Sequence, residues 1–152
     1  MLLKDCTQIY TLGPQGTFSD EATQKVLKTG VRVTYTGTFS EALGKVTEDV
    51  GSAAVVPVEN SVAGTVAQVQ DSLVRNDLII LGEINLLIEY SLLANAKLDQ
   101  IEVCFAHPQA LEQSSEFITN NLGKAQNHFT RSNVDSGIRF LEAVDSGDRK
   151  SV

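Results

Sequence analysis

Residues 8–19, with the sequence QIYTLGPQGTFS, decide the fold class of this chain. The run QIYTL at residues 8–12 predicts a strand, and the two glycines after it predict a turn. A helix is then expected from residue 19 to residue 27, with Ser19 as its N-cap.

The same order of strand, turn and helix recurs along the next forty residues. Residues 31–35 predict a second strand, and Ser40 is expected to cap a helix over residues 41–49. Residues 53–58 are continuously apolar, which is typical of a strand buried on both faces of a parallel sheet. Strands and helices that alternate in this way predict an α/β fold with mainly parallel sheets.

The second half of the chain has a different rhythm. A helix is expected at 66–73, strands at 78–81, 84–94, 102–106 and 125–131, and helices at 109–122, with Pro108 in the first turn, and at 134–144. The change near Gly82 predicts two lobes, about 1–82 and 83–152, with a cleft between them. The length of 152 residues supports one ordinary core rather than two independent domains, so we expect a single bilobal unit.

Composition excludes several classes of function. The net charge is -7 and the 12 Lys and Arg residues are scattered, which argues against a nucleic-acid partner. Cys6 and Cys104 are far apart, so neither a metal site nor a disulfide framework is expected, and a reducing cytoplasm is the simpler location. The longest apolar stretch is interrupted by Gly82, Glu83 and Asn85, so no membrane span is predicted.

Two polar loops follow predicted strands. GPQGTFS at residues 13–19 contains glycines, hydroxyls and the free N–H groups of a helix start, which can hold an anion or form a plain capped turn. PVENSVAGT at residues 57–65 offers an acid, an amide and hydroxyls for a ligand, or a cap for the next helix. Because ligands bind at the carboxyl ends of strands in α/β sheets, we expect the two loops to face one another.

The remaining reactive side chains give weaker signals. His107 lies at a strand-to-helix junction, where it could orient a carboxylate or transfer a proton. His128 is predicted to be a surface or packing residue, and Cys104 an inert, buried thiol. The sequence contains no GxSxG elbow, no HExxH motif and no convincing pair of carboxylates.

The stretches GPQGTFS (13–19), VPVENSVAGT (56–65) and HPQALEQ (107–113), in this order and spacing, resemble the signature segments of prephenate dehydratases. The resemblance implies a bilobal fold related to type 2 periplasmic binding proteins, with dianionic prephenate held in the cleft between the lobes. It further implies conversion of prephenate to phenylpyruvate in phenylalanine biosynthesis, with no cofactor. The residues that it implies for substrate binding are Thr17, Ser19, Asn60, Ser61, Gly64 and Thr65 in the first lobe, and His107, Gln109, Gln113, Ser132 and Asn133 in the second.

The chain departs from the family pattern in three places. Ser114 stands where many members carry cysteine, and Asn133 replaces the usual threonine of a Ser-Thr pair. The family continues to a Thr-Arg-Phe motif whose threonine assists loss of the hydroxyl, whereas this sequence ends at Val152. Thr130, Arg131 and Ser132 lie too early to take that role, so the catalytic residue is left unassigned. We expect a chain that retains the binding half without the proton donor.

Three functions are therefore kept open. The first is a prephenate dehydratase, the second a ligand-binding module without turnover, and the third a related prephenate decarboxylase. A sheet edge left open by a missing strand would favour pairing, so a homodimer is expected.

Overall fold

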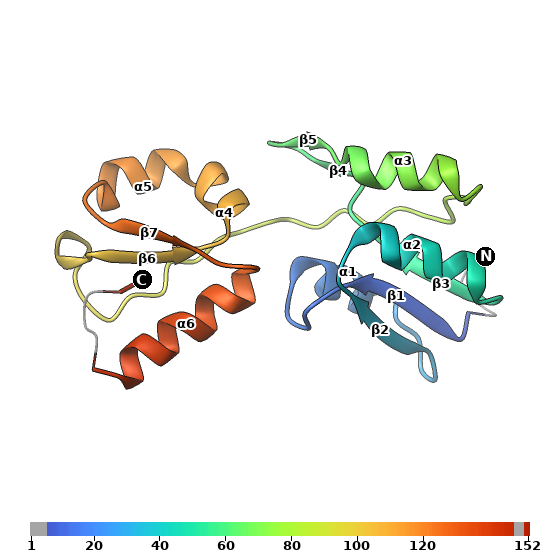
Figure 1. Cartoon of the computed structure of the whole chain (residues 1–152), viewed down its shortest axis with the longest axis horizontal. Coiled ribbons are helices and arrows are strands. Elements are labelled where there is room, and N and C mark those ends of the chain that lie inside the picture. The colour runs from blue at the N-terminus through green and yellow to red at the C-terminus, as the bar shows by residue number, and fades with distance from the viewer. Residues whose placement is uncertain (1–5, 148–150) are drawn as a thin grey trace. The chain divides into compact units, whose positions relative to one another are not determined.

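The chain folds into two compact units, residues 1–87 and 88–152 (Figure 1). The structure is a computed structural model that describes residues 6–147 and 151–152. Each unit contains its own parallel sheet with helices packed on it, which confirms the predicted α/β class.

The first unit is built on a three-stranded parallel sheet of β1 (Gln8–Leu12), β2 (Arg32–Thr36) and β3 (Ser52–Val55). The strand order is β2-β1-β3, with Gln8 opposite both Arg32 and Ser52. The central strand is β1, in which Ile9 and Thr11 are fully buried. The prediction that residues 53–58 are buried on both faces is wrong, because β3 is shorter and lies at an edge of the described sheet, with Ala53 as its one buried residue.

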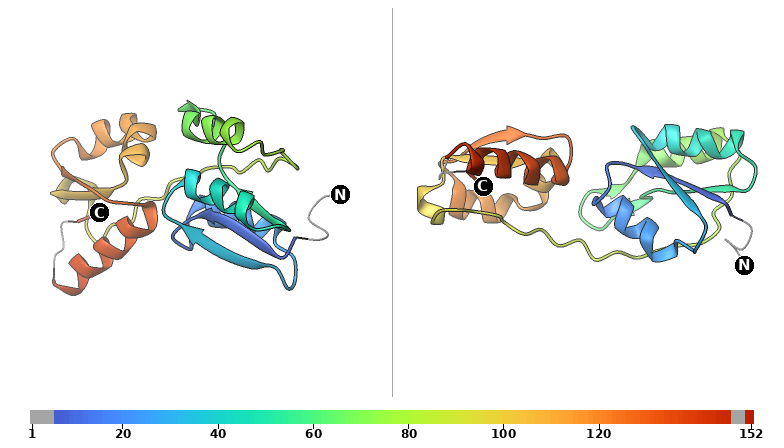
Figure 2. Two further views of the ribbon diagram at one scale, coloured as in Figure 1. Left: turned by 45° about the vertical axis from the view of Figure 1, so that its right-hand side comes forward. Right: turned by 90° about the horizontal axis from the view of Figure 1, so that it is seen from below.

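Helices α1 (Phe18–Val26) and α2 (Phe39–Glu48) cover opposite faces of this sheet (Figure 2). The connections from β1 to β2 and from β2 to β3 run in opposite directions across the sheet, so two right-handed crossovers place their helices on opposite faces. Helix α3 (Ala67–Arg75) packs on α2, with Val69 fully buried and the Ser40 and Ser72 hydroxyl oxygens 3.0 Å apart.

Between β3 and α3, a short hairpin of β4 (Glu59–Asn60) and β5 (Gly64–Thr65) leaves the sheet. After α3, residues 78–94 form neither helix nor strand, so the two strands predicted there are wrong. A strand needs a hydrogen-bonded neighbour, and no described residue forms a ladder with this segment. Its apolar side chains therefore include exposed ones, such as Ile79, Ile80 and Leu87.

The second unit contains β6 (Val103–Ala106) paired in parallel with β7 (Gln126–Phe129), with Val103 opposite Gln126. The backbone of Val152 lies on the other side of β6, where its carbonyl oxygen accepts from the Phe105 N–H at 2.7 Å. The core of this unit consists of Ile101, Cys104, Leu122 and Val152. Burial raises the pKa of the Cys104 thiol, as expected for an inert thiol.

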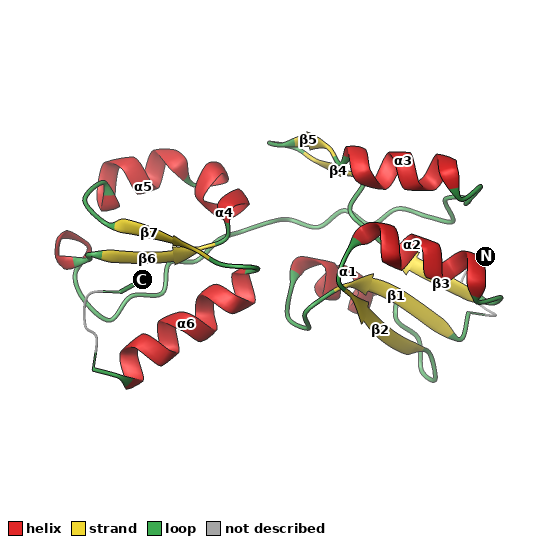
Figure 3. Ribbon diagram, in the orientation of Figure 1, coloured by secondary structure: helices red, strands yellow, loops and turns green. Residues whose placement is uncertain are grey.

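Four helical segments complete the second unit: the 3-10 turn η1 (Leu98–Gln100), α4 (Pro108–Gln113), α5 (Ser115–Leu122) and α6 (Asn133–Asp145) (Figure 3). The single helix predicted over residues 109–122 is wrong, since the backbone leaves helical geometry at Ser114, with φ -105° and ψ 14°. His128 is exposed and meets the Phe105 ring edge-on, with centroids 5.6 Å apart, which confirms it as a surface and packing residue.

Candidate functional site

The loop from β1 to α1 is organised by a variant of the capping box, in which the acid bonds the N–H of the residue before the cap. The Thr17 hydroxyl accepts from the Asp20 N–H at 3.4 Å, and the Asp20 carboxylate accepts from the Gly16 N–H at 2.8 Å. The same hydroxyl donates to the Pro14 carbonyl oxygen at 2.9 Å. The Thr17 side chain therefore serves the loop itself, and the predicted N-cap, Ser19, lies inside the helix instead.

Asp20 brings a negative charge into this loop. Burial raises the pKa of its carboxyl group, but hydrogen bonds from Gly16, Tyr35 and Gln24 outweigh burial and hold the pKa below its ordinary value. Asp20 is 6% exposed and ionised near neutral pH. A ligand anion at residues 13–19 thus cannot use the Gly16 N–H, whereas the Ser19 hydroxyl has no hydrogen bond to any described residue.

Capping boxes of the same type begin two further helices. At α2 the Thr38 hydroxyl accepts from the Glu41 N–H at 3.1 Å and Glu41 accepts from the Gly37 N–H at 2.9 Å, so the predicted Ser40 cap is wrong. The pattern [ST]-x-x-[DE] occurs at Thr17, Thr38 and Ser132 but not at Ser19 or Ser40. This spacing in the sequence would have identified the correct caps.

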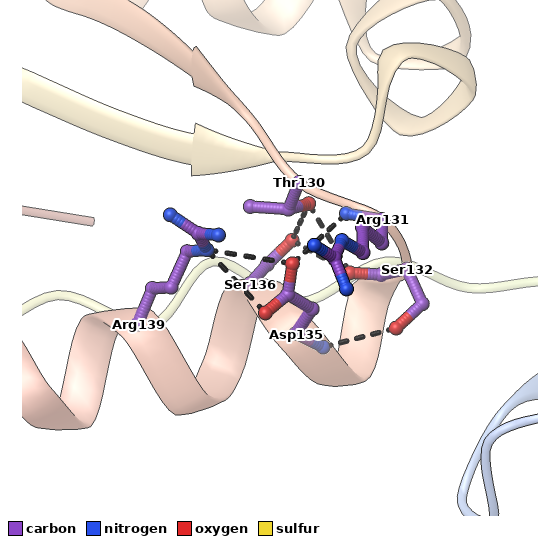
Figure 4. Close-up of polar contacts among 6 residues, drawn as sticks. All are labelled: Thr130, Arg131, Ser132, Asp135, Ser136 and Arg139. Atoms are coloured by element: carbon purple, nitrogen blue, oxygen red, sulfur yellow. Dashed lines mark hydrogen bonds and ion pairs between the residues drawn. The ribbon is translucent and has the colours of Figure 1, made fainter.

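Figure 4 shows the third capping box, at the start of α6, together with the side chains around it. Ser132 accepts from the Asp135 N–H at 3.0 Å, and Asp135 accepts from the Arg131 N–H at 2.9 Å. Thr130 is 6% exposed, and its hydroxyl oxygen lies 2.7 Å from that of Ser136. Thr130, Arg131 and Ser132 are therefore engaged in forming this helix start.

The β4–β5 hairpin holds the four other residues predicted for the first unit. The Asn60 side-chain oxygen accepts from the N–H groups of Val62 and Ala63, at 2.8 and 3.1 Å, and so closes the turn. Gly64 has φ +75°, a conformation that favours glycine. Ser61 and Thr65 are exposed. The side-chain oxygen of Asn60 shapes the loop, and the exposed hydroxyls face solvent.

Both polar loops of the first unit start at the carboxyl ends of the adjacent parallel strands β1 and β3, and so lie at the same end of the sheet. The loop after β1 leads to a helix on one face, and the loop after β3 leads toward α3 on the other face. Adjacent strands whose connections diverge in this way form the switch point at which α/β proteins bind ligands.

In the second unit, His107 is the N-cap of α4. Its Nδ1 accepts from the Gln109 N–H at 3.3 Å, so a neutral ring carries its proton on Nε2. Pro108 occupies the first turn, as predicted, while Gln109 is exposed.

Two of the other predicted residues, Gln113 and Asn133, are joined by a third side chain. The Tyr90 hydroxyl donates to Gln113 Oε1 at 2.8 Å and also shares a side-chain hydrogen bond with Asn133. Burial raises the pKa of Tyr90, and the bond with Asn133 partly offsets this increase. No sequence motif singles out Tyr90, which lies in residues 78–94, a segment that forms neither helix nor strand.

A hollow of about 310 Å³ lies elsewhere in the second unit, between η1 and the end of α5. None of the predicted site residues lines it. Within residues 6–147 and 151–152, no group of three or more His, Cys, Asp or Glu side chains is arranged to hold a metal ion. The same residues include no helix with the length and apolar character needed to cross a membrane.

Comparison with known proteins gives the family. The prephenate dehydratase family model matches residues 9–148. The chain belongs to the prephenate dehydratase family. A prephenate dehydratase of Methanocaldococcus jannaschii is 38% identical over 114 residues, which cover 72% of this chain and 40% of that protein.

Two solved structures of similar fold are described with different activities. The prephenate dehydratase of Staphylococcus aureus superposes with a TM-score of 0.74 at 29% identity, covering 87% of this chain and 50% of that one. A protein described as GqqA, a quorum-quenching acylase, superposes with a TM-score of 0.66 at 25% identity, covering 95% of this chain and 51% of that one. The chain thus spans half or less of the M. jannaschii and S. aureus proteins, and similar folds are described with different activities.

Proposed function

We propose that the protein converts prephenate to phenylpyruvate, as a step of phenylalanine biosynthesis. One observation carries this proposal: the three stretches 13–19, 56–65 and 107–113 each follow a parallel strand, β1, β3 or β6, at its carboxyl end. Ligands bind at this edge in α/β sheets. The family match over residues 9–148 supports the same assignment.

The substrate would be held by hydrogen-bond donors rather than by a cluster of cations. We infer that two lobes, of the kind seen in type 2 periplasmic binding proteins, enclose the dianion, with a boundary near residues 82–87. The contacts would come from Thr17, Ser19, Asn60, Ser61, Gly64 and Thr65 in the first lobe, and from His107, Gln109, Gln113, Ser132 and Asn133 in the second. The hydroxyls of Ser19, Ser61 and Thr65 suit this role best, because those of Thr17 and Ser132 act as caps.

The proposed reaction requires the protein to orient the substrate rather than to form a covalent bond with it. Loss of carbon dioxide and of the ring hydroxyl is driven by formation of an aromatic ring, so the protein needs to orient the ring and hydrogen-bond the departing oxygen. Each preorganised donor in such a site contributes about 2.7–4 kcal/mol to transition-state stabilisation. No residue of the chain is assigned as the proton donor.

The proposed pathway and the exposed apolar side chains bear on the cellular location and the oligomeric state of the protein. We propose a cytoplasmic protein that forms a homodimer, since residues 78–94 expose apolar side chains such as Ile79 and Leu87. Sedimentation that shows a monomer across a wide range of concentrations would exclude the dimer.

Product analysis tests the function directly. The chain is incubated with prephenate, and the products are separated and identified. Phenylpyruvate supports the proposal, a non-aromatic keto acid indicates a decarboxylase, and unchanged prephenate that still binds indicates a binding module.

A matched pair of variants tests the proposed site. Gln113→Ala removes a proposed substrate contact, whereas Gln126→Ala removes an exposed glutamine on β7. We expect weaker binding of prephenate for the first variant alone. Equal affinities would remove Gln113 from the site.

A further inference from the structure

The side chain of Gln113 contains a hydrogen-bond donor that the described protein does not use. Its Nε2 atom is buried and has no acceptor within hydrogen-bonding distance among the described residues. An unmet buried donor costs about 1–3 kcal/mol, and native structures contain few of them. Such a group at a proposed ligand site indicates that the missing acceptor belongs to the ligand.

The direction of this amide is set by Tyr90. Because Gln113 Oε1 accepts from the Tyr90 hydroxyl at 2.8 Å, the other end of the amide must present its two N–H groups. Asn133, at the first position of α6, bonds the same phenol. One side chain thus links residues of α4 and α6 from a segment outside both helices.

We propose that Tyr90 is a positioning residue, which holds the Gln113 amide so that its N–H₂ group donates to a carboxylate or carbonyl oxygen of the substrate. This inference rests on the proposed function, and it names a residue that no signature stretch contains. A charged oxygen is the stronger acceptor, so the carboxylates of an oxo acid fit best.

The donor is covered while the residues that hold it are exposed. Tyr90 is 38% exposed and belongs to residues 78–94, with which no described residue forms a β-ladder, and Asn133 is exposed. The proposal therefore requires only side-chain movement near the surface for an acceptor to reach Gln113. The same phenol orients the amide before the substrate binds.

The test combines Tyr90→Phe with a matched control. Tyr10→Phe removes one phenol hydrogen bond as well, the 3.0 Å bond to Asp49, but in the first unit. In nitrogen-15 NMR spectra, the side-chain amide pair of Gln113 is identified by its loss in Gln113→Ala. We expect this pair to shift and to exchange faster with water in Tyr90→Phe, and to stay unchanged in Tyr10→Phe.

Titration with prephenate completes the test. Loss of one ordered donor is expected to weaken binding about tenfold in Tyr90→Phe, with wild-type affinity in Tyr10→Phe. A Gln113 amide pair that is indifferent to Tyr90→Phe overturns the inference, as does equal affinity of both variants. Absence of prephenate binding by the wild type would instead reject the proposed function and the acceptor, while the amide signals alone would still decide whether Tyr90 positions Gln113.

Discussion

The Thr11 hydroxyl donates a hydrogen bond to the Val55 carbonyl oxygen at 2.9 Å, from the end of the central strand to the end of its neighbour β3. The Ser19 carbonyl oxygen lies 3.4 Å from the same hydroxyl. Thr11 is fully buried, so water cannot replace these contacts. One side chain thereby connects the strand ends from which both polar loops of the first unit depart.

Thr11→Val should destabilise the first unit while preserving the shape of the side chain. Removal of the hydroxyl leaves the Val55 carbonyl oxygen without this partner, at a cost of about 1–3 kcal/mol. Urea unfolding measures the change. Thr47→Val is the control, because Thr47 is exposed and water can take the place of its hydroxyl as the donor to the Gly44 carbonyl oxygen. A change below about 0.5 kcal/mol is expected for this variant. Equal losses in both variants would contradict the role of Thr11.

Gly13 is predicted to tolerate no side chain. A Cβ atom at this position would lie 2.9 Å from the Tyr35 Cβ, so Gly13→Ala forces strands β1 and β2 to adjust. We expect a loss of about 1–3 kcal/mol in unfolding free energy. Gly44→Ala is the matched control, since its Cβ meets no atom within 4 Å and alanine favours the α2 helix by roughly 0.5–1 kcal/mol. A stable Gly13→Ala protein would show that the contact is relaxed at little cost.

The capping residues Thr17 and Ser132 are predicted to contribute more stability than Ser19, which does not cap a helix. Thr17→Ala and Ser132→Ala each remove a cap of α1 or α6, and each should lower the free energy of unfolding by about 1 kcal/mol. Ser19→Ala is the control within the first box, because Ser19 lies in the helix and its hydroxyl contacts no described partner. Thermal unfolding provides the comparison, and an effect of Ser19→Ala as large as that of Thr17→Ala would refute the assignment.

Asp20 and Tyr35 make stability depend on pH at both ends of the range. The pKa of Asp20 is lowered in the folded state, so its stabilisation is present above the ordinary carboxyl pKa and is lost as pH falls through the folded value. Burial, with the bond to Asp20, raises the pKa of Tyr35 to about 12, so stability is complete below the ordinary value of 10.0 and is lost as pH rises toward 12.

Two variants separate these contributions. Asp20→Asn should flatten the acid side of the curve of unfolding free energy against pH, and Tyr35→Phe the alkaline side. Urea unfolding at a series of pH values measures both. An acid limb that Asp20→Asn leaves as steep as in the wild type would show that other carboxyl groups account for it.

Much of the fold follows from local sequence. The stretches at residues 8–12, 31–35, 102–106 and 125–131 predicted strands at nearly the right positions. In the first three, the signal comes from side chains that alternate or stay apolar. The runs at 78–81 and 84–94 carry the same signal and yet form no strand, since pairing requires a partner that local sequence does not specify.

The site divides in the same way. The three signature stretches were recognisable from their residues alone, and the structure places each after a parallel strand. Thr17 and Ser132 were predicted to bind substrate, but their hydroxyls cap helices. Only the spacing rule for capping boxes could have shown this from the sequence. Tyr90 had no sequence signal at all, because its role depends on meeting Gln113 and Asn133, which lie far away in the chain.

The sequence by itself determined the α/β class, the parallel strands and the family, since each depends on patterns within short stretches. Only the tertiary structure decided that β1 is central, that Thr11 joins the ends of two strands, and that Tyr90 orients Gln113. These relationships are hydrogen bonds between residues distant in sequence, and their geometry exists only after the chain has folded.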